Sequence, residues 1–363
     1  MIANCALDGF EVVEVTNELP LNRLGGVGSA IESLVSGFRA LGVRALWYLV
    51  DHHYRPDEVQ RILREFDHVA IGSLDELAKV RAPVAHVHTY HHDPAVLRRG
   101  LHGRRTVFTV HSLLRCEAES NAIDLDHAVR EQEQTFAACD QVVLLSNAEL
   151  GHYRRLGYTA LNPRVRVVHN GLRPPPPAPR GQRDDRTCRI GFCGRLVPRK
   201  RPEHVQWLLR EPEFGDCLTY IAGRGFSPYA RDLMADERLA ARVRYLGWCG
   251  AERLESFYRA IDVLAITSIY EPFGMVALEA MARRVPVVCT RVDGLVEVLG
   301  DAAVYAEDTG YEAFHAAMRR WRAMSCEALL AMTGRAHARY EAEFTDVAAA
   351  RAYRKLFEAL LRS

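Results

Sequence analysis

Two kinds of hydrophobic pattern alternate along the chain. One is a short run of apolar, often β-branched residues, which is typical of a buried strand. The other repeats apolar residues at every third or fourth position, as at Leu34, Phe38 and Leu41, and indicates one buried face of a helix. Since the strand-like runs are apolar on both faces, we expect a parallel sheet that helices cover on both sides. In the first half, strands are predicted at 12–16, 43–50, 68–71, 84–88, 106–110, 141–146 and 165–169, and helices at 28–41, 56–66, 94–99, 126–138 and 147–156.

A proline-rich segment interrupts this alternation at 174–187. It can form neither a helix nor a central strand, so we expect a linker, with a surface loop inside one domain as the alternative. The pattern then predicts two long helices from Tyr311 to the C-terminus, and strands at 188–193, 218–222, 243–246, 263–267, 285–289 and 302–305. The expected fold is therefore α/β, with doubly wound Rossmann-like domains at 1–173 and 188–345 that face a central cleft.

Composition excludes several classes of protein. The 47 basic and 46 acidic residues give a net charge of +1, so the chain has no bulk attraction to nucleic acid or to anionic membranes. No apolar run is long enough for a transmembrane segment. The nine cysteines include no C-x-x-C pair, which favours free thiols over disulfides or zinc and predicts a cytoplasmic protein. Among the basic residues, only Lys79, Lys200 and Lys355 are lysines.

The strongest chemical motif runs from Ser268 to Met281 and follows a predicted strand. Glu271 is expected in the loop at the end of that strand, and Glu279 in the helix that begins near Gly274. Backbone amides at the start of this helix have no intrahelical acceptor, so they can bind an anion or a hydroxyl group. The alternative is an ordinary strand–helix junction whose carboxylates lie at the surface.

A second motif, Gly191–Pro202, places two different cations after another predicted strand. Arg195 offers a forked set of donors and Lys200 a compact charge, a combination that suits a diphosphate. The alternative is a solvated basic loop, because Arg199 and Arg201 flank the lysine.

These motifs resemble the signature of a known family. Glu-Pro-Phe-Gly with a second glutamate eight positions after the first is similar to retaining GT-B glycosyltransferases of glycosyltransferase family 4, also called glycosyl transferases group 1. The resemblance extends in order over nearly the whole chain. It implies that Glu271 and His111 contact the transferred sugar, that Glu279 holds the ribose, and that Arg195 and Lys200 neutralise the leaving diphosphate.

The same resemblance assigns further donor-binding positions. The glycine loop before the first helix would face the donor phosphates and the acceptor, and the other glycines and amides would lie around the nucleotide: these positions are Gly25, Gly26, Gly223, Gly247, Phe273, Gly274, Met275 and Val276. Residues 346–363 resemble the family's C-terminal helix, which crosses back to the first domain. Packing on its own domain is an equally open alternative.

The resemblance predicts a retaining, metal-independent hexosyltransferase. It would move a hexose or N-acetylhexosamine from a nucleotide-diphosphate sugar, with UDP favoured, to a hydroxyl of a small acceptor, and it would need no cofactor. The alternatives are another GT-B enzyme, such as a nucleotide-sugar epimerase or a phosphorylase, and a non-catalytic nucleotide-sugar-binding subunit. Either a monomer or a homodimer is compatible with the sequence.

Two further clusters were considered as binding sites. His86, His88, His91 and His92 suggest a metal, but His86 and His88 alternate along a predicted strand and no acidic ligand is placed to complete a site, so we predict no metal site. The acidic segment after His111 includes Glu117 and Glu119, which suit a cationic acceptor such as an aminocyclitol of natural-product biosynthesis. The alternative is a solvated loop and helix start.

Overall fold

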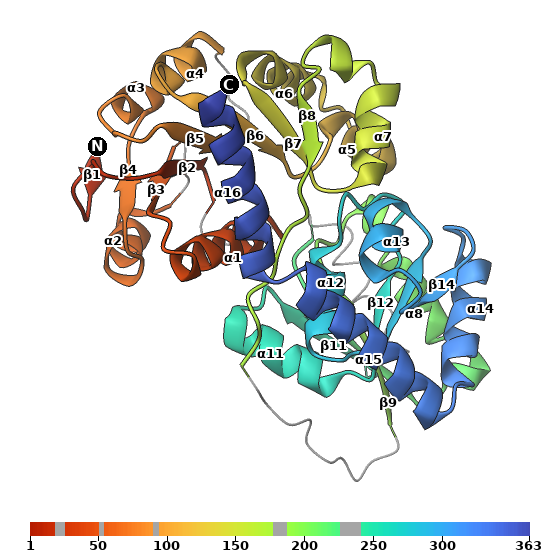
Figure 1. Cartoon of the computed structure of the whole chain (residues 1–363). Coiled ribbons are helices and arrows are strands. Elements are labelled where there is room, and N and C mark those ends of the chain that lie inside the picture. The colour runs from red at the N-terminus through yellow and green to blue at the C-terminus, as the bar shows by residue number, and fades with distance from the viewer. Residues whose placement is uncertain (19–25, 51–53, 90–93, 177–186, 226–240) are drawn as a thin grey trace. The chain divides into compact units, whose positions relative to one another are not determined.

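The structure, a computed structural model, describes residues 1–18, 26–50, 54–89, 94–176, 187–225 and 241–363 (Figure 1). The chain forms two compact units. The first comprises Met1–Ala118, Ile123–Arg173 and Thr345–Ser363, and the second comprises Glu119–Ala122 and Pro174–Phe344. Most of the expected linker, 177–186, lies outside the described residues.

The first unit is built on an eight-stranded sheet of order β1-β4-β3-β2-β5-β6-β7-β8. All neighbours run parallel except β1 and β4, which pair antiparallel at the edge. The chain order reverses between β2 and β5, which makes this pair the topological switch point of the sheet. The strands are β1 (Ile2–Ala3), β2 (Val12–Thr16), β3 (Ala45–Leu49), β4 (Val69–Ile71), β5 (Val84–Val87), β6 (Arg105–Val110), β7 (Gln141–Leu144) and β8 (Val165–Val167).

Helices of the first unit include one from each end of the chain. In Figure 1 the C-terminal helix α16 lies beside α1, and apolar residues of both pack with the central strands in one core cluster. Gly37 of α1 allows this approach, because a Cβ there would lie 2.2 Å from the carbonyl oxygen of Asp346. Of the two alternatives for this helix, the structure has it on the first unit. The helices are α1 (Gly26–Ala40), α2 (Pro56–Glu65), α3 (Leu74–Leu77), α4 (Pro94–Leu101), α5 (Leu114–Asn121), α6 (Asp126–Ala138), α7 (Asn147–Arg155), η2 (Tyr158–Ala160) and α16 (Asp346–Arg362). The last residues of α5, from Glu119 on, belong to the second unit.

The second unit contains a six-stranded, wholly parallel sheet of order β11-β10-β9-β12-β13-β14. Its switch point lies between β9 and β12. The strands are β9 (Cys188–Cys193), β10 (Cys217–Ala222), β11 (Val243–Gly247), β12 (Val263–Ile266), β13 (Val287–Thr290) and β14 (Val304–Ala306). The helices are η3 (Pro198–Lys200), α8 (Glu203–Leu208), η4 (Pro212–Phe214), α11 (Ala251–Ala260), α12 (Met275–Ala282), α13 (Asp293–Leu299), α14 (Tyr311–Arg322) and α15 (Cys326–Glu343).

The structure confirms the expected α/β class with parallel sheets, but the prediction of two long C-terminal helices was wrong. Three helices, α14, α15 and α16, occupy this region because two hydroxyl side chains start new ones. Ser325 Oγ accepts from the amide of Ala328, and Thr345 Oγ1 accepts from that of Ala348, both at 3.2 Å. None of the helices that the structure describes is both long and apolar enough to cross a bilayer.

Candidate active site

The loops that follow β9 and β12 meet at the switch point of the second sheet. Because neighbouring parallel strands end at the same edge, the segment after β9 is brought beside Ser268–Glu271, which follows β12. Two backbone contacts fix this arrangement: Ile269 N donates to the carbonyl of Arg199 at 2.8 Å, and Thr267 Oγ1 donates to that of Lys200 at 2.6 Å. The main chain of Lys200 is therefore fixed independently of the contacts that its ammonium group makes.

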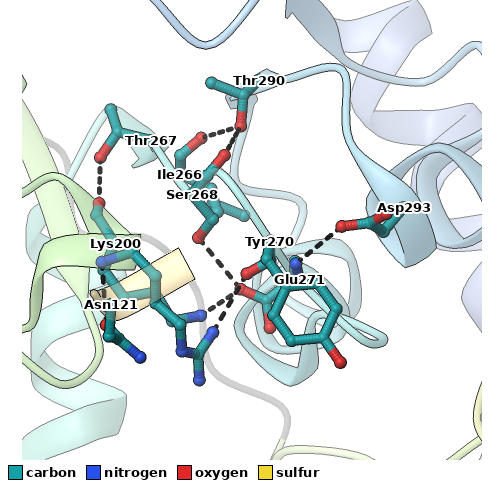
Figure 2. Close-up of polar contacts among 10 residues, drawn as sticks. Asn121, Lys200, Ile266, Thr267, Ser268, Tyr270, Glu271, Thr290 and Asp293 are labelled. Atoms are coloured by element: carbon teal, nitrogen blue, oxygen red, sulfur yellow. Dashed lines mark hydrogen bonds and ion pairs between the residues drawn. The ribbon is translucent and has the colours of Figure 1, made fainter. Parts of the chain in front are cut away.

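An ion pair joins Lys200 and Glu271 at this point (Figure 2). Their side chains are only 13% and 10% exposed. Ser268 Oγ donates to the same carboxylate oxygen, Oε2, at 3.1 Å, and the Glu271 amide donates to Asp293 Oδ2 at 3.1 Å. The carboxylate thus has two donors, and its position is fixed from both the side chain and the backbone.

Electrostatics around the pair favour an additional negative charge. Burial alone would raise the pKa of Glu271, but Lys200 and then Arg199 outweigh it and hold that pKa below its usual value. Burial lowers the pKa of Lys200, Glu271 opposes this, and Arg199 and Arg195 lower it further. Two cations, Lys200 and Arg199, therefore act on this carboxylate and Arg195 acts on Lys200, an excess of positive charge that suits a phosphate-bearing ligand.

The structure corrects the alternative that Arg199 belongs to a solvated basic loop. Its residue is 5% exposed, and its Nη1 donates to the carbonyl oxygen of Tyr270 at 3.1 Å. Its amide donates to Asn121 Oδ1 at 3.0 Å. Burial of an arginine requires such partners, and they come from segments distant in sequence, so the sequence held no local signal for it.

Three of the glycines meet at the ends of β9, β10 and β11. Gly223 has a φ of +151°, and a Cβ at this position would lie 1.9 Å from the carbonyl oxygen of Gly194. Its amide donates to the carbonyl of Gly247 at 2.7 Å. The backbones can approach this closely only because no side chain intervenes, which leaves main-chain groups as the lining of this edge of the sheet.

The second glutamate of the motif lies in α12. Gly274 caps this helix with a φ of +100°, and Met275 and Val276 form the first turn. Glu279 is buried and accepts a hydrogen bond of 2.7 Å from the hydroxyl of Tyr258 on α11. Sequence reasoning missed Tyr258, which belongs to a helix that precedes the motif and carried no motif of its own. Phe273, before the cap, is buried in the core.

In the first unit, His111 follows β6 and contacts a buried histidine. Its Nε2 lies 3.0 Å from Nδ1 of His88, whose Nε2 lies 2.6 Å from Glu14 Oε2. His86 Nδ1 is 2.9 Å from the same oxygen. Our statement that no acidic ligand is evident near these histidines was wrong, because the sheet pairs Glu14 directly with His86. The ligand atoms of Glu14, His86 and His88 lie within 4.8 Å of one another.

Gly25, His91 and His92 lie outside the described residues, and Gly26 is the exposed first residue of α1. Glu117 and Glu119 are two positions apart on α5, so they point to different sides of the helix. Glu117 is buried and Glu119 is exposed. The idea that both carboxylates face one cationic acceptor is therefore not supported by their geometry.

Two protein-family models match this chain. The model described as Glycosyltransferase Family 4 matches residues 24–174, and the one described as Glycosyl transferases group 1 matches residues 179–337. Together they account for most of the sequence.

Curated relatives match over shorter stretches. An uncharacterized glycosyltransferase of Methanocaldococcus jannaschii is 38% identical over 121 residues, which are 33% of this chain and 31% of that protein. A D-inositol 3-phosphate glycosyltransferase of Mycobacteroides abscessus is 32% identical over 247 residues, 63% of this chain and 51% of that protein. The matched stretch thus spans from about a third to about half of these relatives' length.

Solved structures share the fold along the whole chain. Sucrose-phosphate synthase of Thermosynechococcus elongatus superposes with a TM-score of 0.78 at 20% identity, covering 97% of this chain and all of that one. HepE of Anabaena, in complex with UDP and glucose, gives 0.75 at 15% identity, covering 96% and 100%. At such identities the likeness concerns the fold.

Proposed function

Because the chain belongs to the glycosyltransferases, with the Family 4 model matching its first half and the group 1 model its second, we propose that it transfers a sugar from a nucleotide-diphosphate sugar to a hydroxyl of a small acceptor. The observation that carries the proposal is the Lys200–Glu271 pair at the switch point between β9 and β12. Ligands of open α/β sheets bind beyond the carboxyl ends of the strands at such points.

Departure of the nucleoside diphosphate requires that growing negative charge be stabilised. Lys200 and Arg195 supply fixed positive charge, and the first turn of α12 supplies amides at the positive end of a helix dipole. These groups can stabilise the leaving diphosphate as a divalent ion does in other transferases, so that no metal is needed. Metal independence is therefore part of the proposal.

Glu271 is proposed to orient the transferred sugar rather than to attack it. Its Oε2 already accepts from Lys200 and Ser268, which lowers its nucleophilicity and leaves Oε1 to accept from a sugar hydroxyl. With no covalent intermediate on this carboxylate, retention of configuration would come from attack on the face that the phosphate leaves. In that scheme the departing phosphate oxygen takes the acceptor's proton.

The nucleoside is proposed to lie over the glycine-lined edge. Buried Glu279 can accept from both ribose hydroxyls while Tyr258 orients it, and Gly223 and Gly247 leave room for the nucleobase. His111 is proposed to contact a hydroxyl of the donor sugar. UDP stays the proposed nucleotide; complexes with UDP and with ADP are both among the structures that share the fold.

We propose a small polyhydroxylated acceptor, because curated relatives of this chain are named D-inositol 3-phosphate glycosyltransferases. A cyclitol, with or without an amino group, belongs to this class.

All nine cysteines are free thiols, which agrees with a reducing compartment such as the cytoplasm.

The proposal is tested with purified protein in two steps. A panel of nucleotide sugars is first screened by thermal shift, because a bound ligand raises the melting temperature with its affinity. The best donor is then incubated with cyclitol acceptors, and the product's anomeric configuration is read by NMR. Binding without transfer to any acceptor and without slow donor hydrolysis would indicate a non-catalytic subunit. Conversion of the free donor to an epimer would indicate the epimerase alternative.

A further inference from the structure

A continuous line of polar side chains runs through the core of the first unit and ends at His111. It starts from Glu14 on β2, which faces His86 of β5 across the switch point of the first sheet and also contacts His88, the residue after β5. Glu14 and His86 are fully buried, and His88 is nearly so. Such a network in an apolar core is stable only when its protons are placed consistently, so the donors and acceptors can be assigned one after another.

The arm toward His111 has one consistent assignment. The pKa of Glu14, which burial would raise, is held at about 2 by His86 and His88, so the carboxylate is ionised and can only accept. His88 must therefore donate from Nε2 over 2.6 Å. Burial lowers the pKa of His88 to about 4, so this ring is neutral and its Nδ1 is an acceptor. His111 must then donate from Nε2 over 3.0 Å.

A second arm leads from Glu14 to α16. His86 Nδ1 lies 2.9 Å from Glu14 Oε2, and its Nε2 lies 2.7 Å from Thr109 Oγ1. Thr109 is in turn 2.8 Å from the hydroxyl of Tyr353 on α16. The direction of each Thr109 hydrogen bond follows the tautomer of His86, and neither bond involves His88 or His111. This arm is therefore separate from the line that leads from Glu14 through His88 to His111.

The first arm ends at a small pocket. His111 is only partly buried and, with Asn170 and Gly171, lines a small pocket of the first unit. Burial, with His88 and His86 nearby, lowers the pKa of His111, so this ring is neutral as well. Since Nε2 is engaged by His88, the ring nitrogen left for a ligand is Nδ1, which carries a lone pair.

We propose that Glu14 and His88 are positioning residues that hold His111 as the Nε2-protonated tautomer, so that its Nδ1 accepts a hydrogen bond from a hydroxyl of the bound sugar. This inference rests on the proposed function for the identity of the ligand. It assigns to Glu14 and His88 a part in donor recognition through the orientation and tautomer of His111. It also requires the sugar to donate at this position, which excludes a substituent that can only accept.

The tautomer can be read directly in the full-length protein, with or without any activity. Uniform ¹⁵N labelling and two-bond nitrogen–proton correlation separate protonated from bare ring nitrogens, and loss of one signal set in His111→Gln assigns the residue. In the wild-type protein, His111 is expected to show a protonated Nε2 and an unprotonated Nδ1. In Glu14→Gln the amide can donate to His88, which reverses both rings and protonates Nδ1 of His111. Tyr353→Phe, at the far end of the other arm, is the control and should leave the His111 pattern unchanged.

Binding measurements connect the tautomer to recognition. Calorimetry compares the preferred nucleotide sugar with analogues in which one hydroxyl is replaced by fluorine, which accepts weakly and never donates. One analogue is expected to bind the wild-type protein about tenfold more weakly than the unmodified nucleotide sugar does, which corresponds to the loss of about one hydrogen bond. This penalty should largely disappear in Glu14→Gln, where Nδ1 carries a proton.

Each outcome separates the two proposals. A wild-type His111 that is protonated at Nδ1 or doubly protonated would overturn the inference, even if Glu14→Gln fails to fold. An unchanged His111 pattern in folded Glu14→Gln would do the same. If no nucleotide sugar binds, the proposed function fails, while the tautomer measurement still decides the network.

Discussion

The Lys200 ammonium contacts the Glu271 carboxylate although the two residues lie 71 positions apart in the sequence. They are neighbours because β9 and β12 are adjacent at the switch point of the second sheet and end at the same edge. Both side chains are nearly buried, so neither charge can be removed without leaving the other poorly solvated. This pair therefore has a part in stability and, under the proposal, in catalysis.

Replacing either member of the pair should abolish most of the transfer. Lys200→Ala and Glu271→Ala are each expected to lower kcat/KM about 10²-fold or more, because a charge that stabilises the leaving group or orients the sugar is lost. Initial rates with the preferred donor check this, and Lys355→Ala, an exposed lysine of α16, is the control. Turnover near wild type in either variant would contradict the proposed active site. The double variant should lose less stability than the sum of the single losses.

Glu279 and Tyr258 should affect donor affinity more than turnover. Glu279→Gln weakens the acceptor for the ribose hydroxyls and is expected to raise the donor Kd about tenfold. Tyr258→Phe removes only the 2.7 Å hydrogen bond that orients Glu279, so a smaller increase is expected. Calorimetry with the nucleoside diphosphate measures both. A loss confined to kcat would argue against a ribose contact.

Transfer should survive removal of divalent metal. We expect full activity after exhaustive treatment with EDTA, because Lys200, Arg195 and the α12 amides supply the positive charge near the leaving group. The check is an assay in metal-free buffer before and after adding Mg²⁺ or Mn²⁺. A strict metal requirement would contradict this and would direct attention to the carboxylate and imidazole groups at Glu14, His86 and His88.

Acid should destabilise the first unit in two stages. Burial lowers the pKa of His88 to about 4, so between pH 6.5 and 4 the unfolded chain binds a proton that the folded chain does not. The free energy of unfolding then falls by up to about 1.4 kcal/mol per pH unit. Below pH 4.5 the Glu14 contribution is lost in the same direction, because its folded pKa is about 2.

Urea unfolding at a series of pH values tests this dependence. His88→Phe should flatten the slope between pH 6.5 and 4, whereas replacement of the exposed His102 by glutamine should leave it unchanged. An equal slope in wild type and His88→Phe would show that His88 is protonated in the folded protein.

Gly223 should tolerate no side chain. In Gly223→Ala the Cβ would lie 1.9 Å from the carbonyl oxygen of Gly194, so strand ends must move apart and both stability and donor binding should fall. Gly103→Ala is a matched control with a φ of +76° and open space around the Cβ, where only backbone strain of about 1–2 kcal/mol is expected. Denaturation of the two variants compares strain alone with strain plus collision. Equal losses would show that the β10 edge can relax.

Local patterns predicted much of the architecture. The strand-like runs at 12–16 and 188–193 coincide with β2 and β9, and the Asp126–Ala138 helix has its expected bounds. The resemblance of Glu271 and Lys200 to a known motif pointed to the two loops that meet beside β9 and β12. The division of the C-terminal helices at Ser325 and Thr345 was not predicted. The sequence held a local signal for it, since both residues are good helix caps.

The sequence by itself determined which segments are strands or helices and which loops carry charge, because periodicity and capping act over a few residues. Tertiary structure alone decided which strands are neighbours. It placed Glu14 against His88 across 74 positions, buried Arg199, oriented Glu279 with Tyr258 and packed α16 on the first unit. These contacts depend on the order of strands in each sheet and on the burial of whole helix faces, which no short window of sequence encodes.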